Sequence, residues 1–289
     1  MPDADLSSAR SWRRDGSADA ELISRSGLVI DIFRLAAPSS AKAAAGSRIL
    51  FFSDLHVRSA ATFSWAPFRG GLLSWSGLEW ISAALQEAIS LAKPTHLVFG
   101  GDLVVHSCWL ERASSMLASL APGIPKFAVL GNWDKRRRRW LPHRAFEEAF
   151  ARAGFRLLMN GSAIAGPIRF YGLDDFKMGL PLYRRPSQDE DGLLNCVVSH
   201  NPDGIVRALG EEDLAGVDLL FSGHTHGGQF RLPLLGALAT SSMHWKCLEM
   251  GLYKCIGSKA KLLVSAGIGA TAVNIRFNCP PQAVLVELL

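Results

Sequence analysis

Short apolar segments alternate with amphipathic segments along most of the chain. Four early segments are brief and almost uniformly apolar, as in strands that are buried on both faces: residues 28–33, 48–52, 96–99 and 126–130. Residues 78–92 and 109–120 instead carry their apolar side chains at helical spacing. Because helices alternate with buried strands, the pattern predicts an α/β fold with helices layered on a sheet.

The second half of the chain adds further strands with fewer helices between them. These strands are expected at residues 168–171, 196–198, 219–221, 261–264 and 283–288. A second sheet is therefore expected. Residues 1–26 show neither pattern, so we expect them to form a loose, flexible tail before one domain that spans residues 27–289.

Composition narrows the class of protein. With 289 residues, 48% of them hydrophobic and 20% charged, the chain can bury a sizeable core. The net charge of +5 favours anionic partners without choosing among them. The five cysteines include no CxxC pair, which favours a reducing compartment over a disulfide framework or a zinc ribbon. The sequence shows no membrane-spanning run and no apolar core of a signal peptide, so a cytoplasmic protein is expected.

Polar side chains follow five of the expected strands at the point where each strand ends. These side chains belong to Asp54 and His56, to Asp102, to Asn132, to His200, and to His224 and His226. Each residue alone could cap a helix or hold a turn. Together they place imidazoles, carboxylates and an amide oxygen at one edge of a sheet, where α/β folds bind ligands. That mixture of ligands suits a pair of Mn, Fe, Zn or Co ions better than Ca.

These motifs resemble those of the calcineurin-like metallophosphoesterases, in which D-x-H, G-D, G-N-H-D/E, a lone His and G-H-x-H occur in this order. The resemblance implies a four-layer α-β-β-α sandwich of two mixed sheets with flanking helices and a dinuclear metal site at the C-terminal strand ends. One metal would be held by Asp54, His56, Asp102 and His226. The other would be held by Asp102, Asn132, His200 and His224, with Asp102 bridging. Manganese is expected, with iron, zinc, cobalt and magnesium as alternatives.

Two further stretches resemble a bacterial branch of this family that includes UDP-diacylglucosamine pyrophosphatases. They are GHTHGGQ at residues 223–229 and IRFNCPP at residues 275–281. This resemblance implies hydrolysis of a lipid-linked pyrophosphate such as UDP-2,3-diacylglucosamine, with release of UMP, in lipid A synthesis. The aromatic side chains of residues 60–80 and the cations of residues 135–139 suggest peripheral contact with an anionic membrane, on the cytoplasmic face of the inner membrane.

Residues 60–80 and 135–139 leave two interpretations open. The first segment is rich in Trp, Phe and Leu, which suits either a buried entry to a helix or an apolar flap that contacts acyl chains. The second, KRRRR, is either a solvated run of charge or a surface for an anionic amphiphile. From it, Lys135 and Arg136 join Asp102 and Asn132 as candidate catalytic residues, because a cation could offset charge on a departing phosphate.

The chain departs from the family pattern at Trp133, where a histidine usually follows Gly-Asn and protonates the leaving group. An indole donates a hydrogen bond but transfers no proton. We therefore expect a leaving group that needs no acid, as in a phosphoanhydride, unless His106 or His143 supplies the proton.

Two other functions remain open on sequence grounds. One is a soluble phosphodiesterase or phosphatase for nucleotides or phosphoproteins, with the aromatic segment buried. The other is a nuclease that binds nucleic acid through KRRRR, which is disfavoured because aromatic residues flank that run without interleaving with it.

Overall fold

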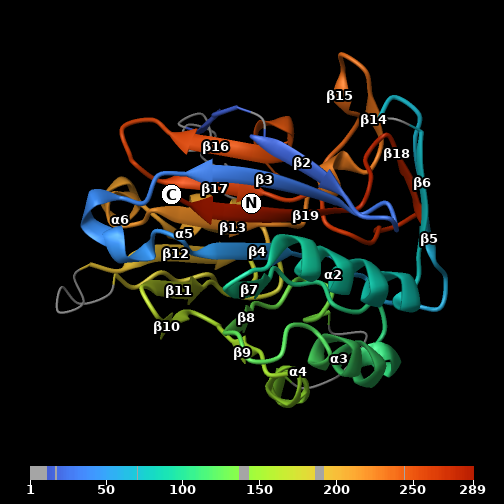
Figure 1. The fold of residues 1–289 in the computed structure, drawn as a ribbon, viewed down its shortest axis with the longest axis horizontal. Helices are drawn as coiled ribbons and strands as arrows, with labels where there is room; N and C mark the ends of the chain where they lie inside the picture. The colour runs from blue at the N-terminus through green and yellow to red at the C-terminus, as the bar shows by residue number, and fades with distance from the viewer. Residues whose placement is uncertain (1–11, 17, 70, 137–142, 186–191, 244) are drawn as a thin grey trace.

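Two seven-stranded β-sheets lie face to face in the structure, a computed structural model that describes residues 12–16, 18–69, 71–136, 143–185, 192–243 and 245–289 (Figure 1). Helices cover the outer face of each sheet. The predicted four-layer α-β-β-α sandwich is confirmed.

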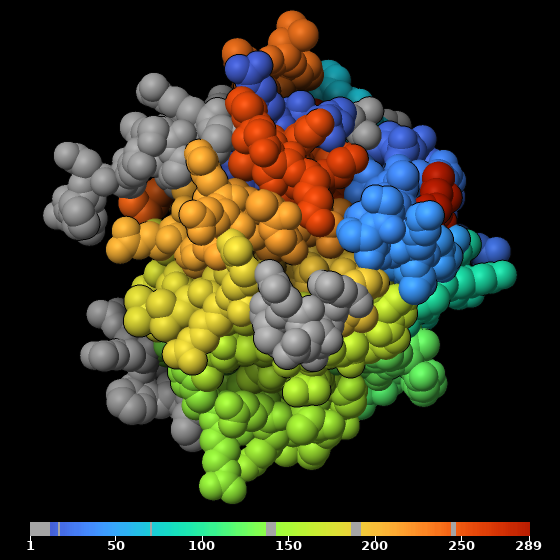
Figure 2. Space-filling model, turned by 90° about the vertical axis from the view of Figure 1, so that its left-hand side faces the viewer, coloured from blue at the N-terminus to red at the C-terminus, as the bar shows by residue number. Residues whose placement is uncertain are grey.

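The first sheet has a parallel centre and antiparallel edges. In spatial order its strands are β1 (Trp12–Arg14), β16 (Gly251–Cys255), β17 (Lys261–Val264), β13 (Leu219–Ser222), β12 (Leu194–Ser199), β11 (Ile168–Gly172) and β10 (Gly161–Ala165). Strands β11, β12, β13 and β17 run parallel to one another, whereas β10 and β16 pair antiparallel with the two outer strands of this group. Figure 2 looks at the end of the molecule that lies on the left in Figure 1, where the surface passes from lime-green at the bottom through yellow and orange to orange-red above.

The second sheet contains most of the early strands. In spatial order they are β2 (Ala20–Ile23), β3 (Val29–Leu35), β19 (Gln282–Leu288), β4 (Arg48–Phe52), β7 (His96–Phe99), β8 (Lys126–Ala128) and β9 (Arg156–Leu157). Strands β4, β7, β8 and β9 are parallel, whereas β19 pairs antiparallel with β4. The carboxyl ends of β4, β7 and β8 therefore meet at one edge.

Alternating side chains of the strands build separate cores. Phe51 points between the sheets, where its ring stacks on that of Phe221 with centroids 5.4 Å apart. Its neighbours Leu50 and Phe52 point into the layer of helices. The helices of the fold are α2 (Leu78–Ala92), α3 (Leu110–Ala118), α4 (His143–Arg152), α5 (Pro202–Ala208) and α6 (Glu211–Ala215), with short 3-10 turns η1 (Ser39–Ala44), η2 (Ser107–Trp109), η5 (His226–Gly228) and η6 (Trp245–Leu248).

The expectation of a loose tail over residues 1–26 is wrong for the described part of that segment. Strand β1 pairs with β16 at the edge of the first sheet, and β2 pairs with β3 at the edge of the second. Edge strands need only one buried face, so their sequences lack the uniformly apolar pattern that identified the central strands. Residues 1–11 lie outside the described residues.

A third, small sheet answers the question left open for residues 60–80. It contains β18 (Ile275–Phe277), β5 (Thr62–Ala66) and β6 (Leu72–Ser76), and lies on the right in Figure 1. The segment is therefore an aromatic β-hairpin followed by the start of helix α2. A hairpin of β14 (Arg231–Leu232) and β15 (Gly236–Ala237) projects at the same end of the molecule. Among the described helices, none has the length and apolar character needed to cross a bilayer.

Candidate metal centre

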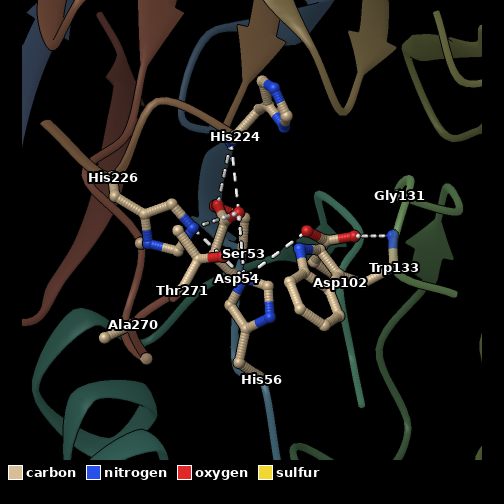
Figure 3. A network of polar contacts seen from close by, with 12 residues as sticks. Ser53, Asp54, His56, Asp102, Gly131, Trp133, His224, His226, Ala270 and Thr271 are labelled. Carbon is tan, nitrogen blue, oxygen red and sulfur yellow. Dashed lines mark hydrogen bonds and ion pairs between the residues drawn. The ribbon is translucent and has the colours of Figure 1, made fainter. Parts of the chain in front are cut away.

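Loops at the carboxyl ends of five parallel strands bring together the seven side chains that the sequence singles out as metal ligands. Strand β4 precedes Asp54 and His56, β7 precedes Asp102, β8 precedes Asn132, β12 precedes His200, and β13 precedes His224 and His226. All seven residues are buried. In Figure 3, Asp54, His56 and His226 point toward one another and the indole of Trp133 lies beside Asp102.

The first candidate group contains Asp54, His56 and His226. The Nε2 atoms of the two histidines are 3.1 Å apart. Oδ1 of Asp54 lies 3.5 Å from Nε2 of His226 and 3.9 Å from that of His56. The backbone amide of His224 and the hydroxyl of Ser53 donate to the Asp54 carboxylate, which fixes its orientation.

The second candidate group contains Asp102, His200 and His224. Nδ1 of His224 lies 3.1 Å from Nε2 of His200. Nδ1 of His200 lies 2.8 Å from the carbonyl oxygen of Gly100, which can accept a hydrogen bond from an Nδ1–H and leaves Nε2 facing the group.

Asp102 lies between the two groups. Its Oδ2 is 3.4 Å from Nε2 of His56 in the first group and 3.3 Å from Nε2 of His200 in the second. The buried Oδ1 of Asn132 has no hydrogen-bond partner among the described residues. A buried amide oxygen without a partner, in the residue before Trp133, whose amide contacts Asp102, is the kind of donor that a divalent cation satisfies.

The backbone of this site is held in a costly conformation. Five of the seven residues have positive φ: Asp54 at 56°, His56 at 46°, Asp102 at 59°, His224 at 67° and His226 at 53°. Such left-handed residues are uncommon outside glycine and gather where function requires them.

Glycines allow the loops to approach one another closely at two positions. A Cβ atom on Gly131 would lie 2.1 Å from Oδ1 of Asp102, and one on Gly267 would lie 2.6 Å from Cβ of Asp54. Each carboxylate therefore packs directly against a neighbouring backbone, with no room for a side chain between them.

Burial and mutual contacts shift the pKa values of the cluster in opposite directions. Burial raises the pKa of Asp54 to about 6. Burial alone would lower the pKa of His200, but the carboxylate of Asp102 outweighs it and raises that pKa to about 10. Burial, together with neighbouring cationic groups, holds the pKa values of His224 and His226 well below their ordinary range. Neutral imidazoles of this kind keep a lone pair for a metal ion.

Asp134 holds the loop that carries Asp102. Its Oδ2 accepts the backbone amides of Asp102 at 2.8 Å and Gly131 at 3.0 Å. Its Oδ1 accepts the amide of Leu103 at 2.9 Å. The sequence marked this acidic residue only as the last letter of the motif, yet it aligns the carboxylate between the two groups.

Lys135 and Arg136, the described cations after Asn132, make different contacts. The amide of Trp133 donates to Oδ1 of Asp102 at 2.8 Å, and the Arg136 guanidinium stacks on the Trp133 indole, 4.3 Å from its centroid. The Lys135 ammonium is buried in an ion pair with Asp174. That pairing balances the charge of Lys135, and the catalytic role expected for this residue remains a prediction. Residues 137–139 lie outside the described residues.

His106 and His143, the alternative proton donors, are both exposed, His106 just before η2 and His143 at the start of α4. Neither belongs to the buried cluster.

Polar residues also follow the end of a sixth strand, which was not recognised from the sequence. Strand β11 is followed by Asp174, Asp175 and Lys177, and the fully buried Asp175 accepts the amide of Lys177 at 2.9 Å. Burial lowers the pKa of Lys177 below its ordinary value, although the charges of Asp203, Asp175 and Asp102 act against that shift. A cation near Asp102 is suited to an anionic ligand. The rule that identified the other ligands, polar residues after a parallel strand, also applies to this position.

Comparison with known proteins agrees with this site. Residues 47–228 match the family model of the calcineurin-like phosphoesterases. The chain is 30% identical over 255 residues to phosphodiesterase YaeI of Escherichia coli, covering 85% of this chain and 83% of that protein. It is 33% identical over 142 residues to the UDP-2,3-diacylglucosamine pyrophosphatase LpxG of Chlamydia trachomatis, covering 47% of this chain and 42% of that protein. Sulfate thiohydrolase SoxB of Thermus thermophilus, solved in complex with glycerol, aligns with a TM-score of 0.48 and 14% identity over 77% of this chain and 52% of that structure.

Proposed function

The chain belongs to the calcineurin-like phosphoesterase family, and from that premise we propose that it hydrolyses a lipid-linked phosphoanhydride, such as UDP-2,3-diacylglucosamine, with two divalent metal ions. The broader activity, metal-dependent hydrolysis of a phosphoester, follows from the family. The phosphoanhydride and the lipid are the parts that we propose.

The buried cluster provides what such a reaction needs. Asp54, His56 and His226 would hold one ion, and Asn132, His200 and His224 the other, with Asp102 between them. Two ions held in this way lower the pKa of a water molecule and neutralise charge on phosphoryl oxygens. The protein keeps Asp102 in place through the amide of Trp133 and the side chain of Asp134.

The environment of the leaving group favours a phosphoanhydride. Trp133 occupies the position of the usual acid and transfers no proton. A departing phosphate has a pKa of about 6 and leaves without one, whereas an alkoxide does not. The Arg136 guanidinium, which stacks on the Trp133 ring, would bind the charge that develops on the departing phosphate.

The observation that carries the choice of a lipid-linked substrate is the exposed apolar face of β5, β6 and β18. Strand β18 is joined to the metal loop, because the Phe277 amide donates to the carbonyl of Gln229 and the Arg276 guanidinium donates to that of His226. An acyl chain on this face would thus be held at a fixed position relative to the loop that carries His226. The pyrophosphatase LpxG, which shares part of the sequence, is named for a substrate of this class.

A soluble phosphodiesterase is the second candidate. It is favoured by the similarity to phosphodiesterase YaeI, which spans 85% of this chain. In that case the substrate would be hydrolysed in solution and the apolar face would have another use.

One comparison of substrates separates the two candidates. The Mn²⁺-loaded protein is assayed with UDP-2,3-diacylglucosamine in mixed micelles and with bis(p-nitrophenyl) phosphate in solution. Our proposal predicts release of UMP with a kcat/KM well above that for the soluble diester. Rapid hydrolysis of the diester without turnover of the lipid would establish the soluble phosphodiesterase instead.

A further inference from the structure

The three-stranded sheet of β18, β5 and β6 exposes an apolar face. Six side chains point outward from its strands: Phe63, Trp65, Leu73, Trp75, Ile275 and Phe277. The alternate positions face inward. Most of them carry polar side chains, namely Thr62, Ser64, Ser74, Ser76 and Arg276, and the other two are Ala66 and the half-buried Leu72. A sheet normally turns its apolar side chains inward and its polar ones to water. Here the arrangement is reversed.

The outward side chains form an ordered surface. Phe63 packs on Trp75 with ring centroids 4.8 Å apart, and Trp65 meets Phe277 edge-on at 5.6 Å. Trp65 and Trp75 nevertheless keep 46% and 60% of their surface exposed. Because pairing across the strands fixes these rings, the face is preformed rather than created by a partner.

The apolar surface extends beyond the strands at both ends. Phe68, in the turn between β5 and β6, is 64% exposed. A bridge between Phe230 and Phe277 connects β18 to the β14–β15 hairpin, whose turn carries Leu234 and Leu235, both highly exposed. Exposed apolar side chains at the tip of a hairpin are suited to entering an apolar phase.

The buried face of the same sheet is joined by hydrogen bonds to the loops of the metal centre. Arg276 is fully buried, and its guanidinium donates to the carbonyls of Gly267 at 3.1 Å and His226 at 3.5 Å. Gln229, just past the GHTH motif, accepts the amide of Thr271 through its side chain and that of Phe277 through its backbone. Whatever binds the outer face is therefore held at a fixed position relative to His226.

We propose that this face, defined by the six outward side chains and the Leu234–Leu235 tip, docks the protein on the interface of a lipid bilayer. Trp and Phe favour the boundary between headgroups and acyl chains. The strand positions of the face carry no charged side chain. The exposed Arg25 lies two residues before Gly27, which contacts β6, and its backbone amide donates to Glu87, so the turn beside the face carries a cation that anionic headgroups favour.

The size of the face argues against a protein partner. Strands of five, five and three residues, spaced about 4.8 Å apart with a rise of about 3.4 Å per residue, cover on the order of 250 Å². A stable interface between two copies of the chain needs about 800 Å² from each partner. A bilayer needs no such minimum, because each exposed apolar side chain gains on its own by entering the apolar phase.

This inference extends the proposed function. The lipid nature of the substrate rests on the proposed function, whereas the docking surface rests on the exposed side chains. Vesicles of phosphatidylcholine and phosphatidylglycerol are sedimented with the full-length protein, its Trp65→Ser/Trp75→Ser variant and an Ile164→Ser control. Ile164 is 46% exposed, like Trp65, but lies on β10. We expect about tenfold weaker vesicle binding for the double variant, unchanged binding for the control, and a blue shift of tryptophan fluorescence in the wild type on binding.

The outcomes separate the two claims. Hydrolysis of bis(p-nitrophenyl) phosphate should be unchanged in both variants, since neither alters the metal centre. Vesicle binding without hydrolysis of the lipid substrate would overturn the proposed substrate but leave the docking surface standing. Absence of vesicle binding, equal binding by wild type and double variant, or a wild-type dimer that the double variant abolishes would overturn the docking surface.

Discussion

The carboxylate of Asp134 accepts the backbone amide of Asp102 at 2.8 Å, so one buried acid positions another. An asparagine at position 134 would offer one acceptor and would turn an amide donor toward backbone donors. We expect Asp134→Asn to lose about 1–3 kcal/mol of stability and about 10–100-fold in metal affinity. Urea unfolding of the chelated protein and a metal titration measure the two effects.

Asp218→Asn is a matched control for that prediction. Asp218 is also buried and accepts a backbone amide, from Asn195 at 2.9 Å, but it lies at the opposite end of β13 from the metal loop. It should cost stability and leave metal affinity unchanged. Similar losses of metal affinity in both variants would show that Asp134 acts only through general stability.

Arg276 should control one candidate metal group more than the other. Its guanidinium holds the carbonyls of Gly267 and His226, which belong to loops around the first group. Arg276→Lys retains the charge but cannot reach both carbonyls, and buried carbonyls that lose their donors cost about 1–3 kcal/mol each. We expect weaker binding of one metal equivalent with the other nearly unchanged. Equal weakening of both would contradict a local role.

Trp133 sets the dependence of the rate on the leaving group. General acid catalysis contributes about 10²–10⁴-fold, and its benefit is largest for poor leaving groups. The wild-type rate should therefore fall steeply as the pKa of the leaving group rises, and Trp133→His should flatten that slope. A series of aryl and alkyl phosphodiesters measures both slopes. Equal, shallow slopes would mean that another residue supplies the proton.

The central architecture could be predicted because its signals are local. Uniformly apolar strands such as residues 48–52 identify the sheet, and polar residues at their carboxyl ends identify the ligand loops. Whether Asn132 and the histidines bind metal remains a prediction, although the structure brings them together.

The rest could not be predicted because it depends on tertiary contacts. Buried serines such as Ser64 and Ser74 face inward while Trp65 and Trp75 face out, so alternation along β5 and β6 does not reveal which side is buried. Nor does the sequence show that Lys135 pairs with Asp174, because the two residues meet only when β8 and β11 are brought together.

Stability should depend on pH through Asp31. Burial, and then the charge of Glu21 on the adjacent strand, raise the pKa of Asp31 from 3.8 to about 6. The folded state therefore holds a proton that the unfolded chain releases near pH 4, so this contribution is fully present below about pH 4 and is lost as pH rises through 6.

The variant Asp31→Asn removes that titration. Because Asp31 is partly exposed, we expect the free energy of unfolding of Asp31→Asn, relative to wild type, to rise by about 1–2 kcal/mol between pH 4 and pH 7. Urea unfolding of the chelated proteins at several pH values gives this difference. A difference that stays constant with pH would contradict the raised pKa.

We expect Asp102 to join two metal ions in one hydrolytic site. A Mn²⁺ titration of the chelated protein tests this directly when bound metal per chain, electron paramagnetic resonance and hydrolysis of bis(p-nitrophenyl) phosphate are followed together. We expect about two ions per chain, a spectrum of exchange-coupled Mn²⁺ ions, and activity that rises with the second equivalent, all lost in Asp102→Ala. One ion per chain at full activity, or two uncoupled ions that survive in Asp102→Ala, would contradict it.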